Sequence, residues 1–392
     1  MLFQLFLLFP LYQFIHMENL VLYRKYRPQV FAEVAGQDHI IQTLCNSIKS
    51  GRVSHAYLFS GPRGCGKTTT ARIMAKALNC QDRKVGNCEP CGKCSSCLEI
   101  TNGNSLDLIE IDAASHRGID DIRELRDGIK YVPSKSKYKV FIIDECHQLS
   151  KDAANALLKT LEEPPAHAIF ILATTELHKM LPTILSRCQR FDFRKLKIDE
   201  LVHRLKGLAE KENVKIDKAA LELVAINAGG SVRDAESLLG QVLVFSGIKG
   251  GKETIKAGDI RDLLGIVEIK FIGDFIDLLT AKKAAEAIAF LNGITDKGFD
   301  LQEFNKSALN YLRHGLIMSL AGLSDSESAG LLLASGLTNE EFARLKQQAS
   351  ELKIERLRKI IELFLGAQEK IRYSPIPQLP LELAIIEACD AV

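Results

Sequence analysis

A glycine-rich sequence that directly follows a short apolar run constrains the fold of this chain more than any other feature. The apolar run is Ala56–Ser60, and the segment Thr69–Leu78 after the motif has the pattern of a helix. In this context the glycines let backbone N–H groups turn inward around phosphate oxygens, and the helix presents its positive end to them. The sequence therefore predicts a nucleotide-binding loop. The motif G-x-x-x-x-G-K-[ST] is formed by Gly61, Pro62, Arg63, Gly64, Cys65, Gly66, Lys67 and Thr68, and Thr69 completes the predicted binding set.

A second apolar run, Lys139–Ile143, ends in the two carboxylates Asp144 and Glu145. A buried parallel strand that ends in this way places its acids at the edge of the sheet where ligands bind. We expect Lys67 to reach the β- and γ-phosphates, and Thr68 and Asp144 to hold Mg²⁺. Glu145 is then positioned to polarise the water that attacks the γ-phosphate. Two acids at a strand end can also form a solvated turn, but the intact phosphate loop favours ATP hydrolysis, with ATP and Mg²⁺ as cofactors.

Short apolar runs alternate with helix-like segments from about residue 21 to residue 193. Continuous apolar runs between helices are typical of a parallel sheet covered on both faces, so we predict an α/β domain over residues 17–197. One helix is well delimited, because Ser150 can cap Lys151–Glu163 and Pro164–Pro165 end it. The five predicted strands are Ala56–Ser60, Leu106–Ile111, Lys139–Ile143, Ala168–Ala173 and Arg190–Phe193.

The strand pattern ends after about residue 196, and the rest of the chain has helical periodicity. Amphipathic segments at 198–212, 217–227 and 231–246 predict a small helical domain over residues 198–264. Residues 265–392 are predicted to form a second helical domain. A chain of 392 residues is long enough for three such domains.

Five of the ten cysteines lie in one short insertion between the predicted Thr69–Leu78 helix and the next strand. A disulfide framework distributes pairs along a short secreted chain, whereas a tight cluster in a long chain favours a metal. Four thiolates suit tetrahedral Zn²⁺; an Fe–S cluster is the alternative, although the surrounding Arg, Lys and Asp favour a structural zinc at residues 80–97. Five cysteines for four ligand positions leave one cysteine spare. Because the cysteines do not form the pattern of a disulfide framework, we predict a reducing compartment. The clustered cysteines are Cys80, Cys88, Cys91, Cys94 and Cys97, and the scattered ones are Cys45, Cys65, Cys146, Cys188 and Cys389.

Composition excludes a disordered or collagen-like chain, because 46% of the residues are apolar and 26% are charged. The net charge of +2 predicts no strongly polyanionic partner, although local basic patches can still contact nucleic acid. The apolar run Met1–Ile15 is shorter than the ~20 residues of a membrane span and has no positive n-region or cleavage site of a secretory signal. We interpret residues 1–16 as a non-native extension and predict no membrane partner; a genuine anchor or signal is the alternative.

Several further motifs occur in the order seen in a known family. They are Tyr23–Pro28, Val34–Gln37, the phosphate loop, the cysteine insertion, Asp144–His147, Leu172–Thr175, Ser186–Cys188 and Gly229–Ala235. In these motifs the chain resembles the gamma/tau subunits of the bacterial DNA polymerase III clamp loader, which are AAA+ ATPases. The resemblance covers about Glu18 to the C-terminus, and the cysteine insertion together with Ser186–Cys188 makes it specific.

The resemblance implies roles for individual residues. Thr175 is similar to the polar sensor of the γ-phosphate, and Arg187 to an arginine finger that acts on ATP bound to a neighbouring subunit. Arg233 is similar to the second sensor, which reaches from the helical lid to the phosphates. Arg24 and the Val34–Gln37 turn resemble the segment that closes over the nucleotide base. The implied zinc ligands are Cys80, Cys91, Cys94 and Cys97, with Cys88 as the spare cysteine.

Each implied role of a threonine or arginine also has a simpler alternative. Surface arginines commonly form ion pairs with nearby acids without any catalytic role. The alternatives are a strand cap for Thr175, an ion pair between Arg187 and Asp192, and an ion pair between Arg233 and either Asp234 or Glu236.

As a whole, the resemblance implies an ATP-driven motor subunit in a ring with copies of itself, delta and delta-prime. Such a ring opens the sliding clamp and loads it on primer–template DNA for the DNA polymerase III holoenzyme. The DNA is expected to be read through its backbone and shape, because the sequence has no base-reading motif. A cytoplasmic location is expected, and the last helical domain would form the oligomeric collar. The family is catalogued with DNA-directed DNA polymerase, a nucleotidyltransferase, but no polymerase chemistry is expected in this chain.

Two other functions remain as alternatives. A non-hydrolysing structural subunit of the same ring would need a broken phosphate loop, whereas Gly66, Lys67 and Thr68 are intact. Another AAA+ motor, such as a branch-migration helicase, is disfavoured by the cysteine insertion. Longer tau forms of the family continue into segments that bind the replicative helicase and the polymerase, and those activities are not assigned to this chain.

Overall fold

The computed structural model describes residues 21–115, 128–129, 131–248, 254–264, 269–296, 298–320 and 339–390. The extension predicted over residues 1–16 lies outside them. The chain divides into two compact units, Met1–Ala257 (unit 1) and Gly258–Val392 (unit 2). Among the described helices, none combines the length and the apolar character that crossing a bilayer requires.

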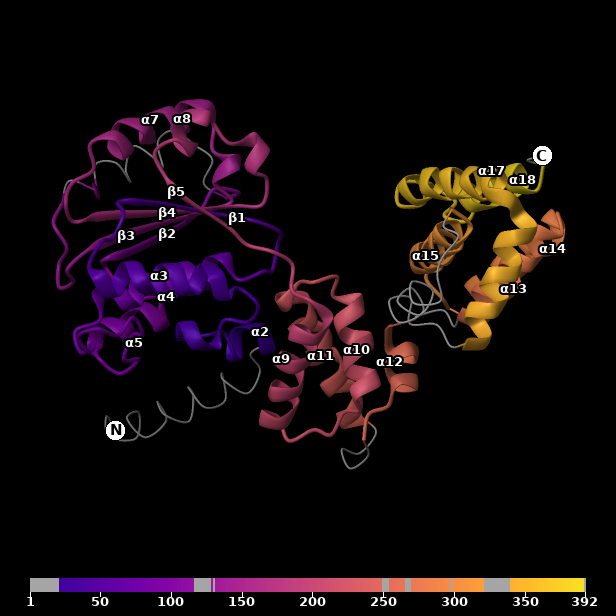
Figure 1. Ribbon diagram of the computed structural model, residues 1–392, viewed down its shortest axis with the longest axis horizontal. Coiled ribbons are helices and arrows are strands. Elements are labelled where there is room, and N and C mark those ends of the chain that lie inside the picture. The colour runs from indigo at the N-terminus through magenta and orange to yellow at the C-terminus, as the bar shows by residue number, and fades with distance from the viewer. Residues whose placement is uncertain are drawn as a thin grey trace, which may run out of the picture. The chain divides into compact units, whose positions relative to one another are not determined.

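A five-stranded parallel sheet forms the centre of unit 1 (Figure 1). The strand order is β2-β3-β4-β1-β5, and every neighbouring pair runs parallel, as the sequence predicts. Because all strands point the same way, the phosphate loop after β1 and the acids at the end of β3 share one edge of the sheet. The strands are β1 (Ala56–Ser60), β2 (Leu108–Asp112), β3 (Lys139–Asp144), β4 (Ala168–Thr174) and β5 (Gln189–Asp192).

Helices cover both faces of this sheet, so its central strands are buried on each side. Tyr57 and Phe59 of β1 pack in one layer with α3 and α4, whereas Leu58 between them packs in the other layer with α7. Figure 1 shows α3, α4 and α5 below the sheet and α7 and α8 above it. The bounds are α3 (Asp38–Ser50), α4 (Lys67–Asn79), α5 (Ser95–Asn102), α7 (Lys151–Glu162) and α8 (Pro182–Leu185); the shorter elements are α2 (Leu22–Lys25), η1 (Phe31–Glu33), η2 (Cys146–Gln148) and η3 (Leu177–Lys179).

Two element boundaries show how local chemistry decides where an element begins. Ser150 caps α7 as predicted, since its hydroxyl accepts the N–H of Ala153 at 3.2 Å. β2 begins two residues later than predicted, because the carboxylate of Asp107 accepts the N–H of Ser134 at 2.7 Å and those of the two residues after it. Leu106 before it is 73% exposed and lies outside the strand.

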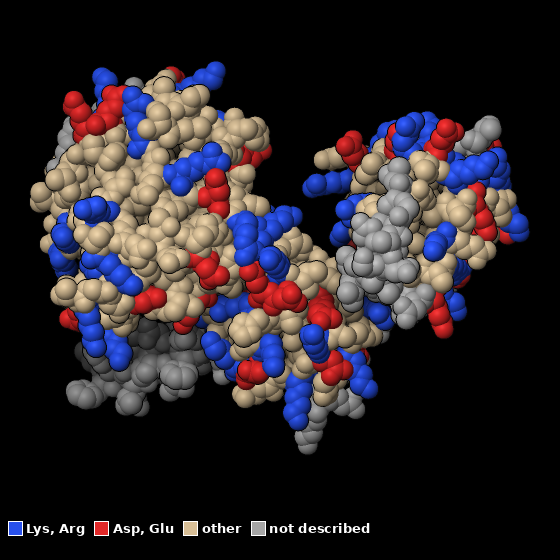
Figure 2. All heavy atoms as spheres, viewed as in Figure 1, with Lys and Arg blue, Asp and Glu red and all other residues tan. Residues whose placement is uncertain are grey.

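Three helices follow the sheet in unit 1, close to the predicted ranges. They are α9 (Ile198–Lys211), α10 (Lys218–Asn227) and α11 (Val232–Ile248). The next helix, α12 (Ala257–Leu264), begins at the last residue of unit 1, and the rest of it belongs to unit 2. The backbone N–H of Val232, at the start of α11, donates to the carbonyl of Gly64 at 3.0 Å. This hydrogen bond joins the helical segment directly to the phosphate loop. On the visible face of unit 1, Lys and Arg side chains lie among Asp and Glu side chains (Figure 2), in keeping with the small net charge.

Helices make up the described part of unit 2, as the sequence predicts. Phe275 lies at the centre of the core and contacts the rings of Phe290, Phe304 and Phe364. A non-helical residue, Lys353 with φ 55°, kinks the longest helix. The helices are α13 (Ile269–Thr280), α14 (Ala284–Asp296), α15 (Leu301–Leu320), α17 (Asn339–Ile371) and α18 (Leu379–Asp390).

Candidate functional site

The phosphate loop, the carboxyl ends of β3 and β4 and the start of α11 surround a cavity of about 560 Å³. Most of the residues predicted to bind or hydrolyse a nucleotide line this cavity, although no local pattern brings these three parts of the chain together. Arg24 and Arg187 are not among its lining residues, and Gly61 and Pro62 precede the lining part of the loop. The predicted residues that line it are Arg63, Gly64, Cys65, Gly66, Lys67, Thr68, Thr69, Asp144, Glu145, Thr175 and Arg233.

The phosphate loop has the backbone that its glycines predict. Gly64 and Gly66 have φ of 75° and 101°, in the left-handed region that glycine adopts without strain. Lys67 is 6% exposed, and its ammonium donates to the carbonyl of Gly61 at 2.7 Å and to that of Pro62 at 2.9 Å. The positive charge of Lys67 is therefore folded back onto the loop, beside the N-terminal end of α4.

Two oxygen groups suited to a magnesium ion lie in direct contact. The Thr68 hydroxyl donates to Oδ2 of Asp144 at 2.6 Å, and Oδ1 of the same carboxylate accepts the N–H of Glu145 at 2.9 Å. Hydroxyl and carboxylate oxygens are hard ligands of the kind that Mg²⁺ binds in nucleotide sites. The predicted magnesium residues therefore fit this ion in their chemistry and in their proximity.

Glu145 is fixed by the end of β4. Its Oε2 accepts two hydrogen bonds from Thr175, one from the backbone N–H at 3.2 Å and one from the hydroxyl at 2.8 Å. Glu145 itself has a φ of 47°, which is uncommon for a residue with a side chain. Thr175 is thus a direct partner of the predicted catalytic acid, rather than only a cap at the end of the strand.

His147 also belongs to this site, although the sequence analysis assigns it no role. Its buried ring lies between two carboxylates: Nδ1 is 3.5 Å from Glu145 Oε2, and Nε2 is 3.1 Å from Glu176 Oε2. Nδ1 also lies 3.0 Å from the hydroxyl of Thr174. The sequence feature that could have indicated this role is the position of His147, two residues after Glu145. Its partners on β4 and beyond it could not be identified from spacing.

The lid side of the cavity carries Arg233. Its guanidinium lies 4.8 Å from the centre of the Tyr23 ring, and the interaction of Arg233 with the phenol is the main cause of a lowered Tyr23 pKa. The alternative ion pair with Glu236 is wrong, because that buried carboxylate pairs with Arg204 at 2.9 Å. The backbone N–H of Asp234 donates to the hydroxyl of Ser231 at 3.2 Å.

The N-terminal segment forms another wall of the cavity, through Pro28, Glu33, Val34 and Ala35 among others. Arg24 does not reach this wall, and lines an adjoining cavity of about 820 Å³ instead. Arg27, Arg72 and Arg233 line the adjoining cavity as well, so four guanidinium groups gather beside Thr68 and Asp144. Burial and the neighbouring Arg72 lower the pKa of Arg27, a residue of the Tyr23–Pro28 motif for which the sequence predicts no role of its own.

Arg187 lies outside the cavity that Lys67 and Glu145 line. Its guanidinium donates to Glu162 Oε1 at 2.6 Å, to the carbonyl of Thr183 at 2.7 Å and to the hydroxyl of Ser186 at 3.1 Å. The alternative partner Asp192 is wrong, since its carboxylate pairs with Arg190 at 2.7 Å.

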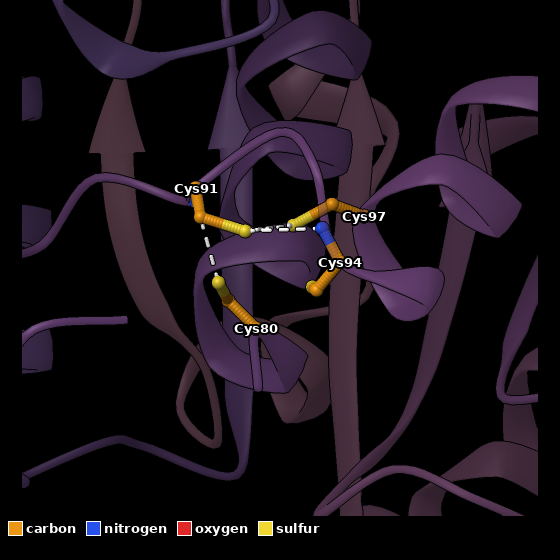
Figure 3. A group of neighbouring side chains, drawn as sticks. All are labelled: Cys80, Cys91, Cys94 and Cys97. Carbon is orange, nitrogen blue, oxygen red and sulfur yellow. Dashed lines mark hydrogen bonds between the residues drawn. The ribbon is translucent and has the colours of Figure 1, made fainter. Parts of the chain in front are cut away.

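The cysteine insertion brings four sulfur atoms together (Figure 3). The Sγ atoms of Cys80, Cys91, Cys94 and Cys97 all lie within 4.8 Å of one another, at the ends of α4 and α5 and in the loop between them. Four converging thiols are the donor set of a structural Zn²⁺ site and also of an Fe–S cluster. Cys88 is excluded from this group, as the resemblance implies.

Backbone amides favour the thiolate form of one of these cysteines. The N–H groups of Lys93 and Cys94 donate to Cys91 Sγ at 3.4 and 3.2 Å, and the amide of Lys93 is the main cause of a Cys91 pKa lowered to about 7. Burial has the opposite effect on Cys80 and Cys97, raising the pKa of each thiol. A cation among the four sulfurs would offset that cost, because metal binding deprotonates its cysteine ligands.

Cys45 and Cys88 form a disulfide, with 4.9 Å between their Cα atoms. The expectation that Cys45 is a single scattered thiol and Cys88 a spare cysteine is wrong for this pair. The two residues are 43 positions apart. They meet because Cys45 points from α3 into the layer that also buries Cys88, which is a tertiary relationship without a local signal.

Protein-family models match nearly all of the described chain. Residues 36–197 match the DNA polymerase III delta subunit, and residues 200–248 match the ATPase lid domain of the DNA polymerase III clamp loader subunit. Residues 255–392 match domain III of the DNA polymerase III subunits gamma and tau. The three matches follow the order of sheet, first helical segment and second helical segment.

Curated relatives give the same result over 94–95% of the chain. The chain is 42% identical to DNA polymerase III subunit tau of Bacillus subtilis, of which it spans 63%. It is 35% identical to subunit tau of Escherichia coli, of which it spans 55%. It is also 35% identical to subunit gamma of Buchnera aphidicola from Acyrthosiphon pisum, and there it spans 99%. The chain thus corresponds to less than two thirds of the tau relatives and to nearly all of this gamma relative.

Proposed function

This chain belongs to the gamma/tau clamp-loader family of bacterial DNA polymerase III, and on that premise we propose that it is an ATP-hydrolysing motor subunit. The observation that carries the proposal is the single cavity shared by Lys67, Thr68, Asp144, Glu145 and the lid residue Arg233. These are the groups that phosphate binding, metal binding and water activation require, and they come from three separate parts of the chain.

The contacts of the phosphate loop suggest how ATP would be accommodated. The ammonium of Lys67 is held by two loop carbonyls, which are weak partners compared with phosphate oxygens. We expect Lys67 to exchange these carbonyls for the β- and γ-phosphates of ATP. Thr68 and Asp144 would hold Mg²⁺ beside them, and the ion would neutralise phosphate charge when bound.

The contact between Glu145 and Thr175 places a condition on hydrolysis. The hydroxyl of Thr175 has one proton to donate, and here it donates to Glu145. If Thr175 donates to the γ-phosphate of ATP instead, Glu145 loses that partner and its Oε2 becomes available to orient a water. Binding of the triphosphate would then prepare both groups at once.

The position of Arg187 supports action on a neighbouring subunit. The side chain is ordered by Glu162 and Thr183 outside the nucleotide cavity of its own chain. An arginine supplied to the ATP of an adjacent subunit would stabilise the charge of the transition state, and it would make hydrolysis depend on assembly of a ring. We propose that this ring contains copies of the chain with delta and delta-prime.

The remaining assignments follow from family membership. ATP binding would let the ring open the sliding clamp and hold primer–template DNA, and hydrolysis would release the closed clamp, in the cytoplasm. We assign residues 17–197 to the ATPase domain, 198–264 to the lid and 265–392 to the oligomerisation domain. The four clustered cysteines would hold a structural Zn²⁺ that supplies folding energy and takes no part in hydrolysis.

ATPase measurements with mixed subunits test this proposal, with the clamp and primed DNA present. Arg187→Ala should bind ATP yet lose about 10³-fold in turnover, the lower end of the effect of such arginines. Mixing it with Lys67→Ala should restore activity, because one variant keeps an intact phosphate loop and the other keeps Arg187. Arg190→Ala, which removes an exposed arginine three residues away, is the matched control and should turn over normally. Normal turnover of Arg187→Ala, without stimulation by clamp and DNA, would refute the motor proposal.

A further inference from the structure

Glu89 lies within the cysteine insertion but holds a different part of the chain. Its Oε2 accepts the backbone N–H of Phe31 at 2.7 Å, and its Oε1 accepts that of Ala32 at 2.9 Å. Each carboxylate oxygen thus has one amide partner. Glu89 itself is next to Cys88 of the disulfide and two residues before Cys91 of the metal cluster.

A second contact ties the same segment to the helices on either side of the insertion. The side-chain oxygen of Gln29 accepts a hydrogen bond from the ammonium of Lys76 in α4 and another, at 3.3 Å, from the hydroxyl of Thr101 in α5. Phe31 is 1% exposed and shares a core cluster with Cys88. Residues 29–32 are therefore held by hydrogen bonds at two points and by an apolar contact.

The other side of this segment faces the nucleotide cavity. Pro28 precedes the anchored residues, Glu33, Val34 and Ala35 follow them, and all four line the cavity. The backbone between Pro28 and Glu33 is short, so a shift of Phe31 or Ala32 moves the lining residues with it. The cysteine insertion is thus connected, through three or four residues of chain, to the N-terminal residues that line the cavity.

We propose that Glu89 is a positioning residue through which the metal-bound cysteine module holds the N-terminal wall of the nucleotide site in its binding conformation. The inference rests on the proposed nucleotide site and goes further, because it gives the module a role in ATP affinity. Four thiolates on one ion would fix the backbone around Cys91, two residues from Glu89, and a fixed backbone favours the hydrogen bonds between the two Glu89 oxygens and their amide partners. If the wall is docked for a smaller fraction of the time, the apparent affinity falls by that fraction.

Glu89→Gln is the most informative substitution, because it keeps size and shape. A glutamine has one acceptor oxygen, so one of the two amides would face its NH₂ group and lose its partner. We expect the Kd for a fluorescent ATP analogue to rise roughly three- to tenfold, since an unsatisfied amide weakens docking but leaves the phosphate loop intact. Hydrogen exchange of residues 29–35 should accelerate, while the zinc content stays unchanged.

Glu99→Gln is the matched control. Glu99 lies in the same module and pairs with Lys135 at 3.0 Å, away from the N-terminal segment. Its Kd and its exchange at residues 29–35 should equal those of the wild type. Cys91→Ser, which removes one metal ligand, should weaken binding like Glu89→Gln, and the double variant should bind no more weakly than Cys91→Ser alone.

The outcomes separate this inference from the function on which it rests. Failure of the wild type to bind the ATP analogue would overturn the nucleotide site itself. Wild-type binding with an unchanged Kd and unchanged exchange in Glu89→Gln would overturn only the role of Glu89. Additive effects of Glu89→Gln and Cys91→Ser would overturn the link between the module and the wall, because residues acting through one route are not additive.

Discussion

Gly64 is the point where the phosphate loop contacts the lid, and the structure shows what an added methyl group would meet there. A Cβ at Gly64 would lie 2.0 Å from the hydroxyl oxygen of Ser231 and 3.1 Å from its Cβ. The hydroxyl cannot rotate away without cost, because it caps α11 by accepting the N–H of Asp234 at 3.2 Å. Gly64→Ala should therefore break this cap or displace α11 from the loop.

Two effects contribute to the loss of stability in Gly64→Ala. At φ 75° an alanine pays about 1–2 kcal/mol for the left-handed conformation. Loss of the Ser231 cap adds about 1 kcal/mol, so Gly64→Ala should lower the free energy of unfolding of unit 1 by roughly 2–3 kcal/mol. Gly51 has φ 70° and open space around the position of a Cβ, so Gly51→Ala carries the conformational cost alone, about 1–2 kcal/mol.

A double-mutant cycle isolates the contact. Ser231→Ala removes the cap by itself and should cost about 1 kcal/mol. In Gly64→Ala/Ser231→Ala the cap is lost only once and the hydroxyl is gone, so the double variant should be about 1 kcal/mol more stable than the sum of the single effects. These free energies are measured by urea unfolding of the nucleotide-free protein, with hydrogen exchange in β1 and α11 as the signal that monitors unfolding. Additivity within ~0.3 kcal/mol, or equal costs for Gly64→Ala and Gly51→Ala, would refute the reasoning.

Three further predictions concern the lid, unit 2 and the cysteine cluster. Glu236→Ala should destabilise unit 1 by about 3 kcal/mol in urea unfolding, because it leaves the Arg204 guanidinium without its buried partner; the exposed Glu222→Ala should cost less than about 1 kcal/mol. Phe275→Ala should cost about 3–5 kcal/mol, seen as faster exchange throughout unit 2 with ATP affinity unchanged, and a loss of ATP affinity would contradict this separation. Zinc affinity in a competition titration should fall as the pH drops from 8 to 6, because Cys80 and Cys97 must lose their protons to bind the ion, and it should fall more steeply below about 7, where Cys91 also becomes a thiol. Affinity independent of pH over this range would contradict the metal assignment.

Several features of the fold could be predicted because their signals are local. The apolar runs of β1, β3 and β4 each lie between helices, and burial on both faces permits only apolar residues there. The Ser150 cap and the phosphate loop depend on residues within one or two helical turns. The boundary of β2 was predicted less well, because Asp107 forms hydrogen bonds with a loop that begins 27 residues later.

The sequence predicted most residues of the candidate site, but it predicted few of the side chains with which they form hydrogen bonds or ion pairs. Lys67, Thr68 and Asp144 could be named from two motifs, and the parallel sheet brings both motifs to one edge. The roles given to them and to Arg187 stay predictions. The ion pair given as the alternative for Arg187 named the wrong acid, since Asp192 is near in sequence whereas Glu162 is near in space.

The sequence by itself determined most helices and strands, the phosphate loop and the set of clustered cysteines, because each of these depends on residues that are close together along the chain. Only the tertiary structure decided that Cys45 pairs with Cys88, that Thr175 donates to Glu145, and that Glu89 accepts the backbone N–H of Phe31. These partners are 30 to 58 residues apart. Their pairing depends on which helix covers which face of the sheet, and hydrogen bonds of a few ångströms form only after packing has brought distant segments together.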